Sequence, residues 1–221
     1  MNTPELWLVG GPNGAGKTTI TRNRPLSELL AGVHFLNPDV RTLELLQQRG
    51  IGSFAEASRQ PAVLRELNIQ AAVDSHAELV QRLRAGEAVA VETVLSTTKY
   101  QPVVEEVLAA GGRCFLIYVA LNSPDMSAQR VRRRVAEGGH DVPIVKLPER
   151  WERSLKLLPW FASRAHRFWV FDNSNSDAEQ RVELVAMGSG HKLTLFNAAA
   201  IPALTRCFTD FGEFEITRPP P

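Results

Sequence analysis

The sequence is poor in cysteine and has no long apolar segment. Its 221 residues include two cysteines, Cys114 and Cys207, which are far apart and do not form the C-x-x-C spacing of zinc or dithiol sites. The first residues lack the basic and apolar regions of a signal peptide, and no segment approaches the roughly 20 apolar residues that span a bilayer. These absences predict a cytoplasmic protein with reduced thiols and no membrane partner.

An excess of charge is also missing. The chain has 25 Lys and Arg against 24 Asp and Glu, a net charge of +1. A nearly neutral chain has no broad positive field for a polyanion, which argues against a dedicated nucleic-acid binder. Hydrophobic residues make up 44% of the chain, enough for a sizeable core, and no linker or repeat divides it. We expect one domain over residues 1–221.

Short apolar runs alternate with segments of helical pattern. Buried strands are expected at 6–9, 33–36, 88–91, 114–121 and 168–171, with helices after residue 17 and at 40–48, 61–85 and 102–110. This alternation predicts an α/β fold with a mostly parallel sheet covered by helices on both faces, and ligands at the carboxyl ends of the strands. Residues 177–221 differ: two apolar runs, 181–187 and 192–196, flank glycines and predict a C-terminal hairpin or edge extension of the 1–176 core.

A glycine-rich segment joins the first predicted strand to the first helix. It matches the pattern G-x-x-x-x-G-K-[ST] of a P-loop, which sits in a three-layer sandwich of the P-loop NTPase type. Glycines let backbone N–H groups surround a β-phosphate, Lys17 would reach the β and γ oxygens, and the Thr18 hydroxyl would bind Mg²⁺. We therefore predict that ATP or GTP is bound with Mg²⁺ by Gly11, Pro12, Asn13, Gly14, Ala15, Gly16, Lys17, Thr18 and Thr19.

Two carboxylates stand where neighbouring strands end. Asp39 follows the second strand and could accept the proton of an attacking hydroxyl, or cap a helix beginning at Val40. Glu92 follows a wholly apolar strand, so its charge needs a partner: an acceptor molecule, a metal-bound water or a structural salt bridge. The polar loop after it, with Thr93 and Ser96, could line an acceptor pocket or simply be solvated.

Arginines are densest between residues 130 and 134. On a helix, Arg130, Arg133 and Arg134 would share one face. The flexible segment Gly138-Gly139-His140-Asp141 follows, so the region at about 124–163 suits a lid that brings guanidinium groups to a transferring phosphoryl group and excludes water. An ordinary solvated helix is the alternative. His140 could touch substrate, although a turn histidine held by hydrogen bonds is the simpler interpretation.

Asp172-Asn173-Ser174 ends the last predicted parallel strand. An aspartate there could bind a metal, but Asp, Asn and Ser are common turn residues, and we favour a turn.

With these segments identified, the sequence resembles the zeta-toxin family of P-loop kinases over about residues 6–175. The motifs that carry the resemblance are Gly10 to Thr19, Asn37-Pro38-Asp39, Glu92-Thr93-Val94-Leu95-Ser96, Arg130-Val131 with Arg134-Val135, Gly138-Gly139-His140-Asp141-Val142-Pro143, and Asp172-Asn173-Ser174. Toxin members of the family phosphorylate the sugar 3′-hydroxyl of UDP-N-acetylglucosamine. The resemblance implies Lys17 and Thr18 at phosphate and Mg²⁺, Asp39 as base, Glu92 on the acceptor, and Arg130 and Arg134 near the phosphates.

The chain looks more like the shorter, stand-alone branch of that family. It has no fused antitoxin helix bundle, so an antitoxin would be a separate small chain covering the nucleotide site. Well-known toxin members carry a threonine and an arginine where Val94 and Ser96 stand here, which leaves the acceptor open.

The sequence thus predicts a phosphotransferase that uses ATP or GTP and Mg²⁺ to phosphorylate a hydroxyl of a small molecule, with UDP-N-acetylglucosamine as first candidate. The alternative is a nucleotide-binding switch or NTP hydrolase with no small-molecule acceptor. The residues expected to act in catalysis are Lys17, Asp39, Arg130 and Arg134, and those expected to bind the acceptor are Asp39, Glu92, Thr93 and Ser96.

Overall fold

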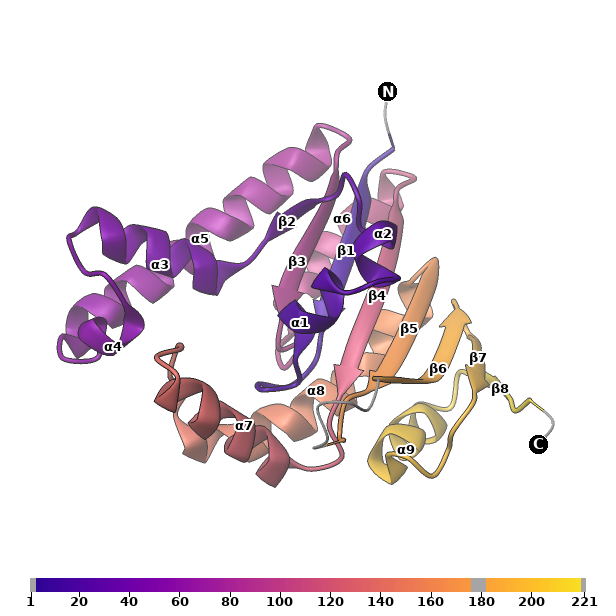
Figure 1. The fold of residues 1–221 in the computed structure, drawn as a ribbon. Coiled ribbons are helices and arrows are strands. Elements are labelled where there is room, and N and C mark those ends of the chain that lie inside the picture. Colours follow the sequence, from indigo (N-terminus) through magenta and orange to yellow (C-terminus); the bar gives the residue numbers. More distant parts are fainter. Residues whose placement is uncertain (1–2, 176–181, 220–221) are drawn as a thin grey trace.

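A mixed sheet forms the centre of the molecule (Figure 1). The computed structural model describes residues 3–175 and 182–219, and these contain an eight-stranded sheet with the strand order β2-β3-β1-β4-β5-β6-β7-β8. The first five strands run parallel: β1 (Glu5–Gly10), β2 (His34–Leu36), β3 (Ala88–Thr93), β4 (Arg113–Ala120) and β5 (Arg167–Asp172).

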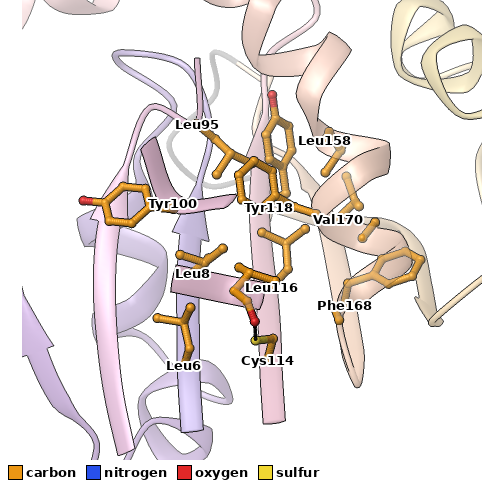
Figure 2. Packing of buried hydrophobic residues seen from close by; sticks show 14 of the residues in the cluster. Leu6, Leu8, Leu95, Tyr100, Cys114, Leu116, Tyr118, Leu158, Phe168 and Val170 are labelled. Atoms are coloured by element: carbon orange, nitrogen blue, oxygen red, sulfur yellow. Dashed lines mark hydrogen bonds between the residues drawn. The ribbon is translucent and has the colours of Figure 1, made fainter. Parts of the chain in front are cut away.

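Helices occupy both faces of this sheet. Side chains alternate along β1, so that Leu6 and Leu8 lie in one core cluster and Trp7 lies in another on the opposite face. Figure 2 shows part of the first cluster, with Leu116 and Tyr118 between Leu8 on one side and Phe168 on the other. The first cluster is covered by α5 (Pro61–Arg84), α6 (Gln101–Ala109), α8 (Leu147–Arg164) and α9 (Pro202–Phe211), and the second by α1 (Lys17–Arg22) and α2 (Leu26–Leu29). The three-layer α/β fold predicted from the sequence is confirmed.

Two further groups of helices lie beyond the layers. α3 (Pro38–Gln48) and α4 (Phe54–Ala57) pack on the far half of α5 through a small core of their own and project from the sheet beside β2 (Figure 1). We call α3, α4 and this half of α5 the arm. α7 (Pro124–Ala136) and the start of α8 lie beyond the carboxyl ends of the parallel strands, and we call them, with the segment 137–146 between them, the lid. Within the described ranges, every helix is too short or too polar to cross a bilayer.

Two sequence expectations about element boundaries change. β3 extends to Thr93, so Glu92 lies inside the strand beside Val9 of β1. α3 begins at Pro38, with Asn37 as its N-cap, because the Asn37 side chain accepts the backbone N–H of Asp39 at 2.9 Å. The interpretation of Asp39 as the cap is therefore wrong: the asparagine before the proline supplies the cap, and proline occupies the first helical turn.

The C-terminal residues extend the sheet. β6 (Glu183–Ser189) pairs antiparallel with β5, β7 (Lys192–Leu195) returns beside β6, and β8 (Glu215–Thr217) forms the outer edge. The predicted hairpin is confirmed, although its expected start at residue 181 lies outside the described residues. α9 places Phe208 against Phe168 of β5, with ring centroids 6.2 Å apart. We propose that these elements and the parallel core unfold as one domain.

This proposal predicts a global loss of stability on replacing Phe208 with alanine. Phe208 is 1% exposed and also meets Phe214 edge to face at 5.0 Å, so Phe208→Ala should lower the free energy of unfolding by about 3–5 kcal/mol. Urea unfolding followed by tryptophan fluorescence and by far-UV circular dichroism should show one shifted transition in both signals. The control Phe196→Ala, at a side chain 42% exposed, should cost about 1 kcal/mol or less. Two separate transitions in the Phe208 variant would contradict a single domain.

Candidate functional site

The loop between β1 and α1 depends on glycine at its two ends. Gly11 has a φ of +143°, and a Cβ there would lie 2.1 Å from the carbonyl oxygen of Val119 in β4. Gly16 is the N-cap of α1 at a φ of +84°, and a Cβ there would lie 2.6 Å from Nδ2 of Asn173. Side chains at these positions would collide with neighbours and strain the backbone, so the loop can close over the carboxyl end of β1 only with glycine there.

The closed loop presents free backbone donors. Ala15 donates its N–H to Pro12 O at 3.2 Å, which tightens the turn. Among the described residues no protein acceptor meets the N–H groups of Gly14, Gly16, Lys17 or Thr18. Consecutive unpaired N–H groups in a tight loop form a concave site that attracts anions, and phosphate oxygens are suitable acceptors. This geometry fits the triphosphate of a nucleotide.

Lys17 carries the positive charge of the loop. Its side chain is buried, and Nζ donates to the carbonyl oxygens of Gly11 at 2.9 Å and Pro12 at 3.0 Å. Burial lowers the pKa of Lys17 below its ordinary value, the carboxylates of Glu92 and Asp39 oppose that shift, and Arg134 adds to it. A buried ammonium held only by carbonyls can exchange them for phosphate oxygens, which are stronger acceptors for a cation.

Glu92 closes the other side of the loop. The hydroxyl of Thr18 donates to Glu92, 2.8 Å from Oε2 and 3.0 Å from Oε1, and the amide of Asn37 donates to Oε2 at 3.1 Å. The partners of Glu92 are thus a hydroxyl and an amide. A structural salt bridge was one of the alternatives considered from the sequence. The three side chains tie the carboxyl ends of β1, β2 and β3 into one junction.

The donor set at this junction suits Mg²⁺. The ion prefers oxygen ligands and usually takes one or two from the protein, with phosphate oxygens and waters completing its shell. Thr18 and Glu92 supply a hydroxyl and a carboxylate in contact. No cluster of three or more His, Cys, Asp or Glu that could hold a metal occurs in the described ranges. A metal at this junction would therefore be shared with the nucleotide, and the residues present fit that arrangement.

Asp39 lies in the first turn of α3, on the arm side of the loop. The side chain is exposed, and the capping role belongs to Asn37, so its carboxylate is available for other contacts. The charge of Asp39 raises the pKa of Lys17 in the loop and of His140 in the lid, so it acts on both parts of the site. A carboxylate in this position can accept a proton from a group beside the terminal phosphate.

The lid rests directly on the loop. The hydroxyl of Ser127 in α7 donates to the carbonyl oxygen of Asn13 at 2.6 Å, and a Cβ at Gly14 would lie 3.0 Å from Cβ of Arg130. This close packing fixes the distance between α7 and the loop. Neither contact has a recognisable local signal in the sequence, because the partners are more than a hundred residues apart.

The arginines of α7 divide into two groups. Arg130 donates to the carbonyl oxygen of Asn175 at 2.9 Å; burial lowers its pKa and Asp172 opposes that shift. Arg134 donates to the carbonyl oxygen of His140 at 2.6 Å and lies near enough to Lys17 to lower its pKa. Arg133 instead pairs with Glu137, and its side chain is 83% exposed. The expectation that Arg133 shares the face of Arg130 and Arg134 is wrong, because α7 turns Arg133 toward solvent.

The segment after β5 supports the loop. The Asp172 carboxylate accepts the backbone N–H of Ser174 at 2.7 Å, which confirms the predicted turn. Next to it, Nδ2 of Asn173 donates to the carbonyl oxygen of Ala15 at 2.8 Å. Sequence reasoning missed this role of Asn173. It also missed the amide of Asn37, although an asparagine before Pro38 is a recognised helix-start signal.

The loop after β3 has a strained backbone. Leu95, with a φ of +58°, is buried, and its N–H donates to the Thr93 hydroxyl at 3.1 Å. The carbonyl of Val94 accepts the hydroxyl of Ser154 at 2.7 Å, which ties this loop to α8. Ser96 is buried. The hydroxyl of Thr93 serves the loop itself, and contact of Thr93 or Ser96 with an acceptor stays a prediction.

A cavity of about 590 Å³ adjoins the junction. Thr18 and Asn37 form one wall, and Lys17, Asp39 and Glu92 are not among its lining residues. Cavities that hold small molecules have volumes of about 300–1,000 Å³, so this one has room for such a ligand. Its other lining residues come from α1, α2, the turn after α2, β2, α3 and α5: Thr21, Arg22, Ser27, Leu30, Val33, His34, Phe35, Leu36, Val40, Arg41, Glu44, Ser75 and Glu78.

Comparison with known proteins supports the fold. No family model matches the chain, and no curated protein matches it in sequence. The crystal structure of AvrRxo1-ORF1:-ORF2 with ATP is similar, with a TM-score of 0.66 and 18% identity over 94% of this chain and 64% of that chain. The structure of the same pair with sulphate ions gives a TM-score of 0.66 and 17% identity over 93% of this chain and 64% of that chain. At these identities the likeness establishes a shared fold.

This chain spans 64% of the length of the AvrRxo1-ORF1:-ORF2 chains that it matches. A weaker likeness, with a TM-score of 0.49 and 19% identity, joins 78% of this chain to 69% of a chain from the PezAT chromosomal toxin-antitoxin system of the human pathogen Streptococcus pneumoniae.

Because the ammonium of Lys17 is buried, we predict that its replacement abolishes nucleotide binding without lowering the stability of the fold. In Lys17→Met a side chain of similar size replaces a desolvated charge, so the free energy of unfolding without nucleotide should stay equal or rise by up to about 2 kcal/mol. Binding of Mg–ATP should be lost. Urea unfolding and isothermal titration calorimetry measure the two quantities.

The free energy of unfolding of Lys17→Met should also depend on pH differently from that of the wild type. Because the folded-state pKa of Lys17 is lowered from 10.5, the unfolded chain binds more protons between the lowered value and 10.5, and the wild type gains stability as pH rises through that interval. Lys17→Met should lack this gain. A large loss of stability in the variant, or equal pH dependence in both proteins, would contradict the description of Lys17 as a desolvated charge.

Proposed function

We propose that this protein is a Mg²⁺-dependent kinase that moves the terminal phosphoryl group of ATP or GTP to a hydroxyl of a small molecule. The observation that carries the proposal is the pair of carboxylates around the P-loop: Glu92 contacts Thr18, and Asp39 lies within electrostatic reach of Lys17. A P-loop alone is shared by kinases, hydrolases and switches. An available carboxylate beside the terminal phosphate is the feature that a transfer to a hydroxyl requires.

Each residue then has a chemical task. The backbone N–H groups of the loop hold the β-phosphate, and Lys17 leaves the carbonyls of Gly11 and Pro12 to pair with the β and γ oxygens. Asp39 takes the proton of the acceptor hydroxyl as the hydroxyl oxygen attacks the γ-phosphorus, and the bond from that phosphorus to the β–γ bridging oxygen breaks to release ADP or GDP. When bound at Thr18 and Glu92, Mg²⁺ would offset the charge on the phosphate oxygens. Arg134 adds positive charge from the lid side.

Arg130 has a different place in this scheme. It packs beside Gly14 and reaches the carbonyl of Asn175, after β5. Its position beside Gly14 puts it next to the loop that would hold the phosphates. We assign it to nucleotide binding, and the catalytic charge to Arg134.

The acceptor and a protein partner are part of the proposal. The resemblance to zeta toxins makes UDP-N-acetylglucosamine the first acceptor to test. A structure that shares the fold was solved with ATP and as the pair AvrRxo1-ORF1:-ORF2, which supports ATP as the donor and a separate small chain as a partner of this protein.

The decisive experiment supplies ATP, Mg²⁺ and UDP-N-acetylglucosamine and detects the product by mass spectrometry. We expect the sugar nucleotide to gain one phosphate, and Asp39→Asn to lower the rate about 10²- to 10⁴-fold, as removal of a general base does. The matched control Asp210→Asn changes an exposed carboxylate of α9 and should keep the wild-type rate.

The possible outcomes separate the alternatives. ATP loss without any phosphorylated acceptor, over a panel of hydroxyl compounds, would indicate a hydrolase. Tight nucleotide binding without turnover would indicate a switch. Product formed at an undiminished rate by Asp39→Asn would overturn the role of Asp39.

A further inference from the structure

Three buried polar atoms without partners belong to the P-loop and to the lid that rests on it. The described residues contain five buried side-chain nitrogen or oxygen atoms that have no hydrogen-bond partner: Trp7 Nε1, Asn13 Oδ1, His76 Nδ1, Arg134 Nε and His140 Nδ1. Such atoms are rare in native proteins, because leaving one unpaired costs about 1–3 kcal/mol. Asn13 belongs to the loop, and Arg134 and His140 belong to the lid above it. Their clustering indicates that a polar ligand completes this region.

The ring of His140 is held in place from both sides. It meets the Phe54 ring of the arm in an edge-to-face pair, with centroids 4.7 Å apart and planes at 67°. From the lid, Arg134 donates to the His140 carbonyl at 2.6 Å, and Val142 is buried in a small cluster with Val131. These contacts involve ring packing and the backbone. They leave Nδ1 unused, so the simple interpretation of a turn histidine held by its own ring hydrogen bonds does not apply at Nδ1.

Some of the charged groups around His140 also act on the P-loop. Asp39 from α3, Arg134 from α7, Arg150 from α8 and the adjacent Asp141 all act on its ring. Two of these, Asp39 and Arg134, also act on Lys17, the ammonium of the P-loop. His140 and Lys17 therefore share two charged neighbours, and the contacts of α7 with Asn13 and Gly14 bring the lid that carries His140 onto the loop that carries Lys17.

We propose that Nδ1 of His140 donates a hydrogen bond to the terminal phosphate of the bound nucleotide. The inference rests on the proposed function insofar as that function requires a nucleoside triphosphate at the P-loop. The contact involves three parts of the molecule. The P-loop binds the phosphate, the lid carries His140, and Phe54 of the arm packs against the His140 ring.

Binding through this atom is coupled to a proton. Burial lowers the pKa of His140; Arg134 and Arg150 add to that shift, and Asp39 and Asp141 oppose it. The ring is therefore neutral near neutral pH before the anion arrives. A phosphate in contact raises the pKa of the ring, because a nearby opposite charge favours the protonated form. Nucleotide binding thus takes up a proton, and affinity rises as the pH falls between the bound and free pKa values.

The test measures the dissociation constant of Mg–ATP by calorimetry from about pH 8 to about pH 6, the range around the ordinary histidine pKa. His140→Ala should weaken binding about 10- to 100-fold, the range for a hydrogen bond to a charged group. His140→Asn places an amide near the position of Nδ1, so it should keep most of the affinity at the higher pH and lose the added gain at the lower pH. Because the nucleotide titrates identically in every sample, the difference between wild type and variant isolates His140.

The controls separate folding from binding. His191→Asn changes an exposed histidine beside Glu213 at the far end of the sheet and should behave as wild type. Thermal melting of each variant without nucleotide reports any loss of packing against Phe54. A lowered melting temperature with an unchanged dissociation constant in His140→Ala would overturn the inference while leaving the kinase proposal intact. A wild-type protein that fails to bind Mg–ATP would overturn both.

Discussion

The buried ammonium of Lys17 is the charge on which the rest of the site depends. It lies inside a loop that can close only with glycine at position 11, because a Cβ there would collide with the carbonyl oxygen of Val119. Removing a charge from water is costly, and two backbone carbonyls compensate for it only in part. The loop is therefore poised for an anion that can pair with this ammonium. The free N–H groups around it point to the same ligand.

The surrounding side chains organise around that charge. Thr18 and Asn37 both donate hydrogen bonds to Glu92, which joins the ends of three neighbouring strands. Asp39 on the arm and Arg134 on the lid both act on Lys17, Asp39 raising and Arg134 lowering its pKa. Arm and lid also meet through Phe54 and His140. Negative charge from the arm and positive charge from the lid thus both act on the ammonium of Lys17.

Local patterns in the sequence predicted most of the fold. The P-loop match, the apolar strands and the C-terminal hairpin depend on neighbours in the chain, and all are present, although β6 continues through Gly188 and Ser189 and the turn begins at Gly190. The same holds for the turn at Asp172. One error arose because Asn37 and Asp39 are both common N-cap residues, and the cap of α3 is Asn37. Another arose because the sequence does not define which face of α7 is buried, and Arg133 lies on the exposed side. Contacts between distant segments, such as Ser127 with Asn13, leave no pattern in a single sequence. The substrate roles of Thr93 and Ser96 stay predictions.

The most direct measurement is a crystal structure with Mg²⁺ and a non-hydrolysable ATP analogue. The account predicts the β-phosphate within the N–H groups of residues 14–18, Nζ of Lys17 moved from the Gly11 and Pro12 carbonyls to the phosphate oxygens, and the metal at the Thr18 hydroxyl about 2.1 Å away. The carboxylate of Asp39 should face the terminal phosphorus across a space open to a hydroxyl. A triphosphate bound elsewhere, or Lys17 still held by the two carbonyls with nucleotide present, would contradict it.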